Sequence, residues 1–201
     1  MDIVLVAAVG KNSNGDLVIG NERSIPWARI EADRLRLHRD FISNKPVILG
    51  YNTFKGIEEI IYRSWPRSHL VVVGDSQRSH SLKNGLKDLC QKSEIEVDFV
   101  RGSREALELI GSGGKRLSGI DYSSVSVLGG ARTYQDFMIW ADRLELTEVE
   151  RVDKKEFEGD CYFPKILDGR KANWNEPSIR PWQNDGELRY RFVSYTCCNK
   201  F

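Results

Sequence analysis

Short apolar runs alternate with segments of helical periodicity through most of this sequence. Such alternation is typical of an α/β fold, in which a mostly parallel sheet carries helices on both faces. The predicted core strands are residues 3–9, 45–50, 69–74, 97–100 and 124–130. The predicted helices are residues 29–43, 53–61, 82–92, 103–110 and 131–139.

The C-terminal part follows a different pattern. Residues 143–150 (RLELTEVE) and 188–198 (LRYRFVSYTCC) alternate polar and apolar side chains, which predicts antiparallel strands at one edge of the sheet. Because the chain contains no internal repeat and no long linker, we expect residues 1–201 to form a single domain. The segments predicted to be polar surface loops are residues 10–16, 75–81 and 111–119.

Charge and hydropathy argue against several classes of protein. The formal net charge of +1 does not favour nonspecific nucleic-acid binding. No apolar run approaches the ~20 residues needed to span a bilayer, and the N-terminal MDIVLVAAVG lacks the basic start of a signal peptide. No C-x-x-C pair occurs among Cys90, Cys161, Cys197 and Cys198, so we expect reduced thiols, no metal site and a cytoplasmic location.

The segment SIPWARIEADRL places two acids at the start of a predicted helix. At ~100° per residue, Asp33 shares a face with the apolar Leu37 and Phe41, whereas Glu31 lies on another side. A carboxylate on an apolar face is costly unless a donor meets it, which makes Asp33 a candidate functional acid. A first-turn acid favoured by the helix dipole explains Glu31 and stays open as the explanation for Asp33.

A strand, two glycines and a helix start follow one another in VSVLGGARTYQDF, residues 125–137. Glycines let the backbone approach a ligand closely, and the free N–H groups of the following helix suit a phosphate. Arg132 lies in the first turn of that helix, where a nearby anion would give it a role. A tight turn without a ligand explains the glycines equally well, and the segment is not the G-x-G-x-x-G dinucleotide fingerprint.

Several short segments, in the right order along almost the whole chain, resemble those of the dihydrofolate reductase family. They are VAAV (6–9), IGNERSIPW (19–27), Asp33, KPVILGYNTF (45–54), Arg67, LGGARTY (128–134), LT (146–147) and EGDCYFP (158–164). In that family the acid lies five or six residues after the tryptophan of the Pro-Trp pair. Asp33 is six residues after Trp27 and Glu31 only four, so the resemblance assigns the acid to Asp33.

The resemblance implies hydride transfer from NADPH to C6 of 7,8-dihydrofolate with protonation at N5, giving tetrahydrofolate for one-carbon and thymidylate metabolism. Asp33 would accept two hydrogen bonds from the pterin, which a carboxylate can do, and an apolar pocket would raise its pKa. Thr147 matches the threonine that hydrogen-bonds the acid, and Trp27 matches the residue that orders a water beside it. Because the family acid is not at N5, a water is expected to deliver the proton.

The resemblance also implies a set of binding residues. Arg67 matches the arginine that clamps the glutamate carboxylate of the substrate, a task that suits a fork of N–H donors. With Asp33, Arg67 and Thr147, the implied substrate-binding residues are Val6, Ala7, Ala8, Ile25, Leu37, Ile57, Leu128 and Tyr134. The implied cofactor-binding residues are Ala8, Ile19, Gly20, Asn21, Ser24, Ile25, Gly50, Tyr51, Asn52, Thr53, Val73, Gly74, Arg101, Leu128, Gly129, Gly130, Ala131, Arg132, Thr133 and Tyr134.

Residues 19–25 resemble the mobile loop that closes over the nicotinamide, and Asp160 matches the acid that contacts this loop from the opposite side. The adenosine end of the cofactor site departs from the family pattern. Cations and a serine are usual there, whereas this chain has Tyr51 and Asn52 after one strand and Val73, Gly74 and Asp75 after the next. We therefore expect weakened discrimination, with NADPH favoured and NADH as the alternative, and with Arg78, Arg101 or Arg132 as basic partners.

The helix of the acid departs from the family as well. Arg34 and Arg36 stand where many members have apolar or aromatic residues. Contact of Arg34 with the glutamate tail, with Asp33 or with solvent stays open, and so does contact of His38 with the tail.

Two other functions stay open from the sequence. One is a folate- or nucleotide-binding structural or regulatory protein that kept the fold without turnover. The other is a reductase of another pterin or of a pyrimidine, which would leave Arg67 without a role. The expected partners are dihydrofolate and antifolate inhibitors, with no nucleic acid and no membrane, and we expect a monomer.

Overall fold

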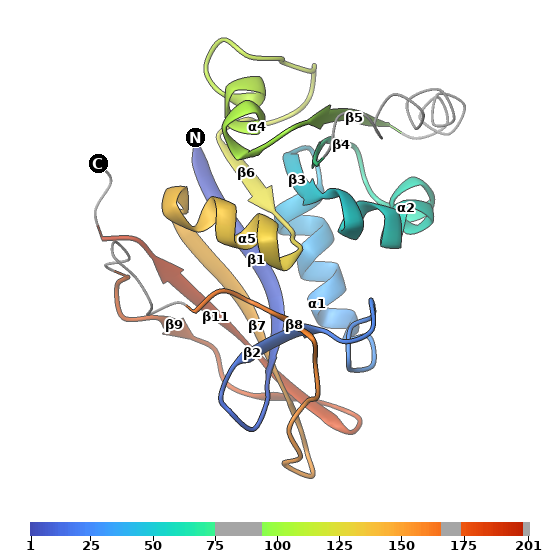
Figure 1. Ribbon diagram of the computed structural model, residues 1–201, viewed down its shortest axis with the longest axis vertical. Coiled ribbons are helices and arrows are strands. Elements are labelled where there is room, and N and C mark those ends of the chain that lie inside the picture. Colours follow the sequence, from blue (N-terminus) through green and yellow to red (C-terminus); the bar gives the residue numbers. More distant parts are fainter. Residues whose placement is uncertain (75–93, 166–173, 199–201) are drawn as a thin grey trace.

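The computed structural model describes residues 1–74, 94–165 and 174–198, which form a mixed sheet flanked by helices (Figure 1). Six strands pair in parallel at its centre. They are β1 (Asp2–Lys11), β3 (Pro46–Gly50), β4 (Ser68–Val73), β5 (Ile95–Val100), β6 (Ser124–Val127) and β7 (Arg143–Arg151).

Antiparallel strands complete the sheet. The strand β11 (Leu188–Thr196) pairs with β7, and both β9 (Ser178–Ile179) and β10 (Gln183–Asp185) pair with β11. The strand β2 (Leu17–Gly20) pairs with the end of β1 and with β8 (Cys161–Tyr162). The order along the main path is β10-β11-β7-β1-β6-β3-β4-β5. The predicted mostly parallel sheet with an antiparallel C-terminal edge is therefore confirmed.

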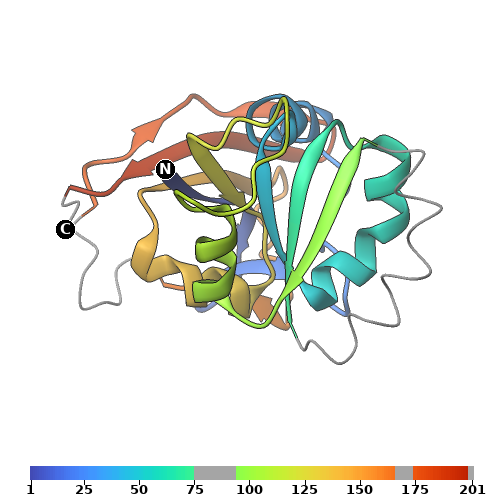
Figure 2. The same ribbon diagram turned by 90° about the horizontal axis from the view of Figure 1, so that it is seen from above.

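Helices cover both faces of this sheet, as predicted (Figure 2). The described helical segments are α1 (Glu31–Arg36), η1 (Leu37–Ile42), α2 (Tyr51–Ser64), α4 (Ser103–Ile110), α5 (Ala131–Phe137) and η2 (Met138–Trp140). Within the described part of the chain, none of them combines the length and the apolar character that a membrane crossing requires.

Two apolar layers hold the helices against the sheet. On one face, Ile110 of α4 and Phe137 of α5 pack in a cluster with strand residues such as Leu5. On the other face, Ile42 of η1 and Phe54 of α2 belong to a second cluster, built on β3 and β4. All five side chains are fully buried. Both faces of the central strands are therefore covered, which explains why their sequences are continuous apolar runs.

Several predicted boundaries differ from those observed. The helix predicted over 29–43 begins at Glu31 and widens into the π turn η1, which lets the adjacent Phe41 and Ile42 both be buried. The strand predicted over 124–130 ends at Val127, because the two glycines that follow turn the chain into α5. The predicted helix 82–92, the loop 75–81 and Cys90 lie outside the described residues, and β2 and β8 were not predicted.

The register of β1, β7 and β11 places a set of side chains on the face of the sheet that contacts α1. Thr147 of β7 pairs with Ala8 of β1 on one side and with Phe192 of β11 on the other. Paired residues point to the same face, and side chains alternate along a strand. Val6 lies two residues before Ala8 and packs beside Phe41 of η1, so this face of the sheet looks toward α1 and η1.

Candidate active site

The acid singled out in the sequence lies between α1 and β7. Thr147 is buried at the middle of β7, and its Oγ1 donates to Asp33 Oδ1 at 2.5 Å. Asp33 itself is half-buried, whereas Glu31 is exposed. The predicted contact of Thr147 with the acid is therefore present, and Asp33, not Glu31, faces the sheet.

Opposing effects act on the ionisation of Asp33. Burial of the carboxyl raises its pKa, while the Thr147 hydrogen bond and the positive charge of Arg36 lower it, and the net effect is a raised pKa. A carboxyl group with a raised pKa and one hydrogen-bond donor is suited to acid–base chemistry. The predicted direction of this change is thus present in the structure.

The segment after β2 lies over the same end of the sheet. Asn21 and Ser24 exchange backbone hydrogen bonds, and Ile25 at its tip is 60% exposed. Asp160 accepts from the Glu22 backbone N–H at 3.3 Å and donates its own N–H to the Gly20 carbonyl at 3.1 Å. The predicted contact of Asp160 with this loop is confirmed.

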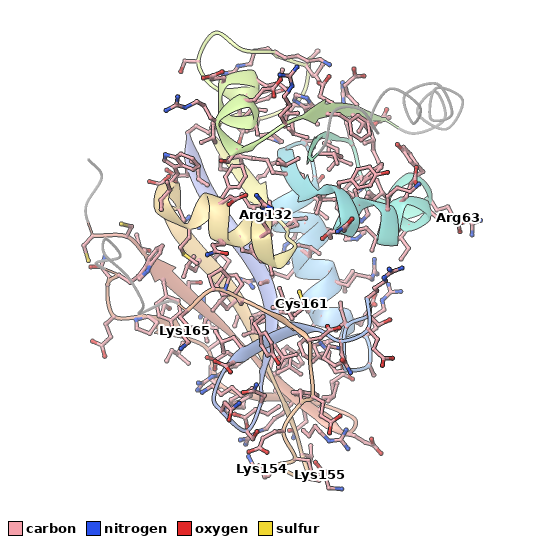
Figure 3. All side chains as sticks on the ribbon, viewed as in Figure 1. Arg63, Arg132, Lys154, Lys155, Cys161 and Lys165 are labelled. Carbon is pink, nitrogen blue, oxygen red and sulfur yellow. The ribbon has the colours of Figure 1, made fainter. Side chains whose placement is uncertain are left out.

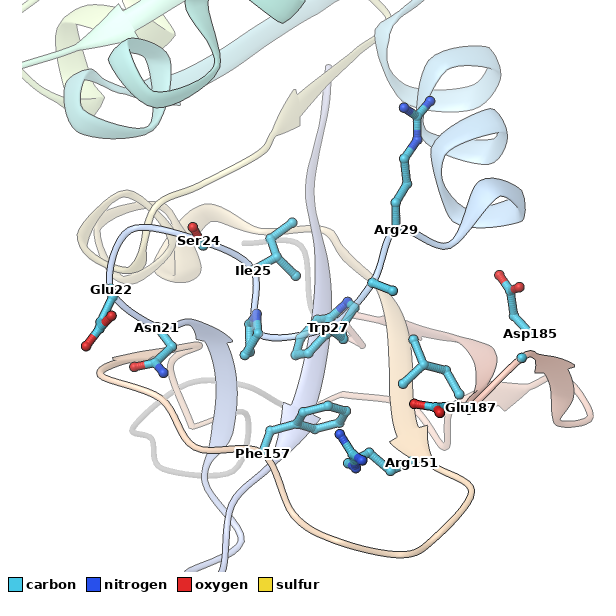
Figure 4. A pocket seen from close by; sticks show the side chains of 14 residues that line it. Asn21, Glu22, Ser24, Ile25, Trp27, Arg29, Arg151, Phe157, Asp185 and Glu187 are labelled. Atoms are coloured by element: carbon cyan, nitrogen blue, oxygen red, sulfur yellow. The ribbon is translucent and has the colours of Figure 1, made fainter.

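A cavity of about 820 Å³ lies against this loop (Figure 4). Trp27 meets Phe157 edge to face there, with ring centroids 4.9 Å apart. Of the predicted site residues, the cavity includes Asn21, Ser24, Ile25 and Trp27. The other residues that line it are Glu22, Pro26, Ala28, Arg29, Arg151, Phe157, Asp185, Gly186, Glu187 and Leu188. Asp33 and Thr147 do not line this cavity, which therefore does not contain the acid.

Two helices begin side by side at the opposite end of the site. The Gly50 N–H donates to the Gly129 carbonyl at 2.6 Å, which joins the ends of β3 and β6. The helix α2 starts after Gly50 and α5 after Gly130, and neither start is capped by a side chain. A Cβ added to Gly50 would lie 2.5 Å from Thr133 Oγ1, so the backbone approach requires glycine. Uncapped N–H groups of two helices suit the phosphates of a nucleotide, so these residues fit a dinucleotide cofactor.

The predicted apolar lining divides between the two faces of the sheet. Val6, Leu37 and Leu128 belong to one cluster on the α1 face, and Ile57 packs in the α2 cluster of the same face. The side chain of Ala7 packs instead in the cluster under α4 and α5. Tyr134 lies in that cluster too, where its hydroxyl donates to the Val6 carbonyl at 2.7 Å and its burial raises its pKa.

Three predicted basic residues lie away from the acid. Arg67 is exposed, and its Nη2 donates to the Ser118 carbonyl at 2.6 Å. Arg101 is exposed at the end of β5. Arg132 is 93% exposed on α5, 3.8 Å from Asp136 (Figure 3). None of these three side chains contacts Asp33 within the described part of the chain.

Some of the remaining cofactor candidates lie where β3 and β4 end, and the others lie on β2 and α5. Thr53 lies 3.0 Å from where a Cβ of Gly130 would be, and Tyr51 packs under Gly74. Asn52 is exposed, and Val73 ends β4. Ile19 and Gly20 belong to β2, and Ala131 begins α5. Asp75 and Arg78 lie outside the described residues.

The structure adds a surface partner to the alternatives considered for Arg34. Its guanidinium pairs with Glu31 three residues earlier, with Nε to Oε2 at 2.9 Å, and this pairing was not among the predicted ones. Glu31 was set aside as a first-turn acid, although an i, i+3 pairing was readable from the spacing. His38 is half-buried, and its burial lowers its pKa.

Arg36 and Glu145 were not predicted to interact. Arg36 turns inward and donates to Glu145 of β7. The one available signal was the spacing of Glu145 and Thr147, which puts two polar side chains on the same face of a strand otherwise rich in apolar residues.

The sequence is similar to those of known proteins. The sequence profile described as "Dihydrofolate reductase" matches residues 2–197. Dihydrofolate reductase 1 of Haloarcula marismortui is 27% identical, over 96% of this chain and 92% of its own length. Dihydrofolate reductase of Bacillus subtilis is 27% identical over 89% and 86%, and dihydrofolate reductase type 3 of Salmonella typhimurium is 29% identical over 96% and 97%. The chain belongs to the dihydrofolate reductase family.

Proposed function

We propose that the protein reduces 7,8-dihydrofolate to tetrahydrofolate, with Asp33 as the acid that binds the pterin and NADPH as the hydride donor. The observation that carries this proposal is the contact of Asp33 with Thr147 between α1 and β7. It fixes one carboxylate oxygen and leaves the other oxygen for the substrate. Family membership over nearly the whole chain supports the reaction, and the relatives compared above are named dihydrofolate reductases.

Asp33 would orient the pterin. An ionised carboxylate accepts hydrogen bonds from the pterin amino group and the adjacent ring N–H, and two such bonds fix the plane of the ring. Val6 and Leu37 belong to one apolar cluster on this face and would contact the pterin ring. Burial makes these bonds stronger than they would be in water.

Asp33 would also set the protonation of the bound pterin. The negative charge of the carboxylate would favour the protonated form of the bound pterin, and a water would deliver the proton from solvent to N5. Trp27 would hold this water near the acid. Ile25, exposed at the loop tip, would cover the site when the loop closes and so exclude other water.

A nicotinamide cofactor supplies the hydride in this family. The residues that would hold it here are the uncapped starts of α2 and α5, together with Gly50, Gly129 and Gly130. At the adenosine end, Asn52 offers an amide where a cation is usual, so we expect the preference for NADPH over NADH to be weak. Arg67 would bind the substrate's glutamate carboxylate after exchanging its bond to the Ser118 carbonyl.

The test is turnover by the purified protein. Dihydrofolate is mixed with NADPH or NADH, loss of reduced nicotinamide is followed, and tetrahydrofolate is identified as the product. We expect one tetrahydrofolate for each cofactor oxidised. Binding of a folate analogue without turnover with either cofactor would instead identify a binding protein on this fold.

The proposal extends to the state of the protein in the cell. We expect a cytoplasmic monomer that antifolate inhibitors bind in competition with dihydrofolate. Size-exclusion chromatography with light scattering measures the mass, and a mass twice that of the 23.0 kDa chain would contradict the monomer.

A further inference from the structure

One turn after Asp33, the same helix carries a second charged side chain that faces inward. Arg36 Nη2 donates to Glu145 Oε2 at 2.5 Å, and the two side chains are only 14% and 7% exposed. Ser194 Oγ donates to the same oxygen of Glu145 at 2.6 Å, and Arg143 Nη1 donates to Oε1 at 3.1 Å. A nearly buried ion pair contributes little more to stability than apolar residues of similar volume, so its place beside the acid calls for another explanation.

Aromatic rings fix the guanidinium of Arg36 in position. Its Cζ lies 4.4 Å from the ring centroid of Phe192 and 5.1 Å from that of Phe41. A planar guanidinium that stacks on rings and donates to a carboxylate has few alternative positions. The positive charge is therefore held at one place close to the acid.

The ion pair repeats the link that Asp33 makes. Asp33 and Arg36 are three residues apart on one helix, and Thr147 and Glu145 are two residues apart on one strand. These spacings put each pair of side chains on a single face. Thr147 pairs in register with Phe192, so the ring stacked on Arg36 stands beside the partner of the acid. Two successive contacts thus tie the helix to β7.

We propose that Arg36, held by Glu145, is a positioning residue for Asp33: it fixes the helix on β7 and holds a positive charge one turn away from the acid. This inference rests on the role of Asp33 in the proposed function. Arg36 touches neither substrate nor cofactor in that function, so it acts through Asp33 alone.

The charges around Asp33 favour this role. Thr147 on β7 donates to the acid, and the charge of Asp33 reaches Tyr134 on α5 and Tyr190 on β11. On its own helix, Arg36, which is paired with Glu145 of β7, is the cation that acts on it. The negative charge of Asp33 contributes to the raised pKa of both tyrosines, and Arg36 lowers the pKa of Asp33 against the effect of burial. When Arg36 is removed, burial still raises the pKa of Asp33, and of the two effects that lower this pKa only the Thr147 hydrogen bond remains.

The experiment measures the titration of the acid directly. Carbon-13 NMR of aspartate carboxyl groups follows Asp33 in the protein without ligands, with the signal assigned by its loss in Asp33→Asn. In Arg36→Met we expect the midpoint to rise by about one pH unit, the usual size of the effect of a nearby opposite charge. In Arg36→Lys, which keeps the positive charge, the titration midpoint of Asp33 should be close to that of the wild type. The midpoint of the pH dependence of kcat/KM should move in parallel.

Two further variants make the outcome decisive. Arg34→Met removes an arginine of the same helix that pairs at the surface with Glu31, and it should leave the midpoint unchanged. If Arg36→Met fails to fold because Glu145 is left unpaired, Arg36→Met with Glu145→Gln removes both charges and should show the upward change.

The results separate this inference from the proposed function. An unchanged midpoint in the folded Arg36 variants, with normal turnover in the wild type, would overturn the positioning role and leave the reaction standing. Absence of turnover in the wild type, with a midpoint that rises in Arg36→Met, would overturn the reaction while the electrostatic link remained.

Discussion

The pterin end and the adenosine end of the site are built in different ways. At the pterin end, Asp33 meets the buried Thr147, and Val6 packs with Leu37 on the same face. At the adenosine end, the described candidates include the exposed Asn52 and Arg101, with side chains held by few neighbours. A substitution at a buried contact of the site also disturbs the packing of the fold, whereas a substitution at an exposed position does not. The reaction should therefore be robust in this chain, and the cofactor preference should be the variable part.

The turn between β6 and α5 joins the two ends, and it should respond strongly to substitution. Gly129 has a φ of +110°, and a Cβ there would lie 3.2 Å from the Tyr134 ring. Gly129→Ala should destabilise the fold by about 1–3 kcal/mol and weaken cofactor binding at least tenfold. Thermal unfolding and cofactor titration measure both effects. Gly102→Ala is the control, because open space surrounds Gly102, and an equal loss in both variants would refute the close-approach explanation.

Arg67 tests whether the substrate has a carboxylate tail. Arg67→Ala should raise the KM for dihydrofolate about tenfold and leave kcat nearly unchanged, because binding is lost equally in the ground and transition states. Arg63→Ala removes an exposed arginine of α2 whose Nη2 lies 3.8 Å from Glu59 Oε2, and it serves as the control (Figure 3). An unchanged KM in Arg67→Ala would point to a substrate without the tail.

Thr147→Val tests the hydrogen bond at the pterin end with little change in volume. Because the hydroxyl lowers the pKa of Asp33, its loss should raise that pKa further. We expect kcat/KM to fall about 10- to 100-fold, the order expected for a hydrogen bond to a charged group of about 1.5–3 kcal/mol. Thr147→Ser, which keeps the hydroxyl, should retain most of the activity, and equal losses in the two variants would assign the effect to packing.

Asn52→Lys tests the adenosine end and should have a smaller effect. A cation on the surface near a phosphate contributes about 1 kcal/mol, so the NADPH to NADH ratio of kcat/KM should rise about fivefold. Asn52→Gln controls for side-chain length. A wild-type ratio already in the thousands would show that discrimination is intact and would remove the contrast between the two ends.

The smallest expected effect is on stability. The folded-state pKa of Asp33 is raised, so the folded protein holds this proton more tightly, and stability falls as pH rises through the unfolded and then the folded pKa. At pH 8 the free energy of unfolding of Asp33→Asn should therefore be about 1 kcal/mol larger than that of the wild type. The variant should accordingly unfold at a higher temperature. The difference should disappear below about pH 3.5, where the carboxyl is protonated in both states.

Sequence patterns located the parts of the site that depend on local periodicity. Helical spacing placed Asp33 on the inner face, and the family resemblance assigned Thr147 as its hydrogen-bond partner. The inward turn of Arg36 depends on Glu145, more than 100 residues later, and its rings come from two further elements. The spacing of residues along one element carries no information about such a partner. The resemblance likewise did not indicate that Arg67 would bind the Ser118 carbonyl, since that loop is outside the family segments.

The most direct measurement is a steady-state assay of wild type and Asp33→Asn with dihydrofolate, with NADPH and NADH in parallel. We expect the variant to lose roughly 10²- to 10⁴-fold in kcat/KM with both cofactors, the range that a positioned acid contributes. The cofactor ratio should stay the same in both proteins, because Asp33 lies at the pterin end. Full activity of Asp33→Asn would contradict the account, since the acid that joins α1 to β7 would then have no part in the reaction.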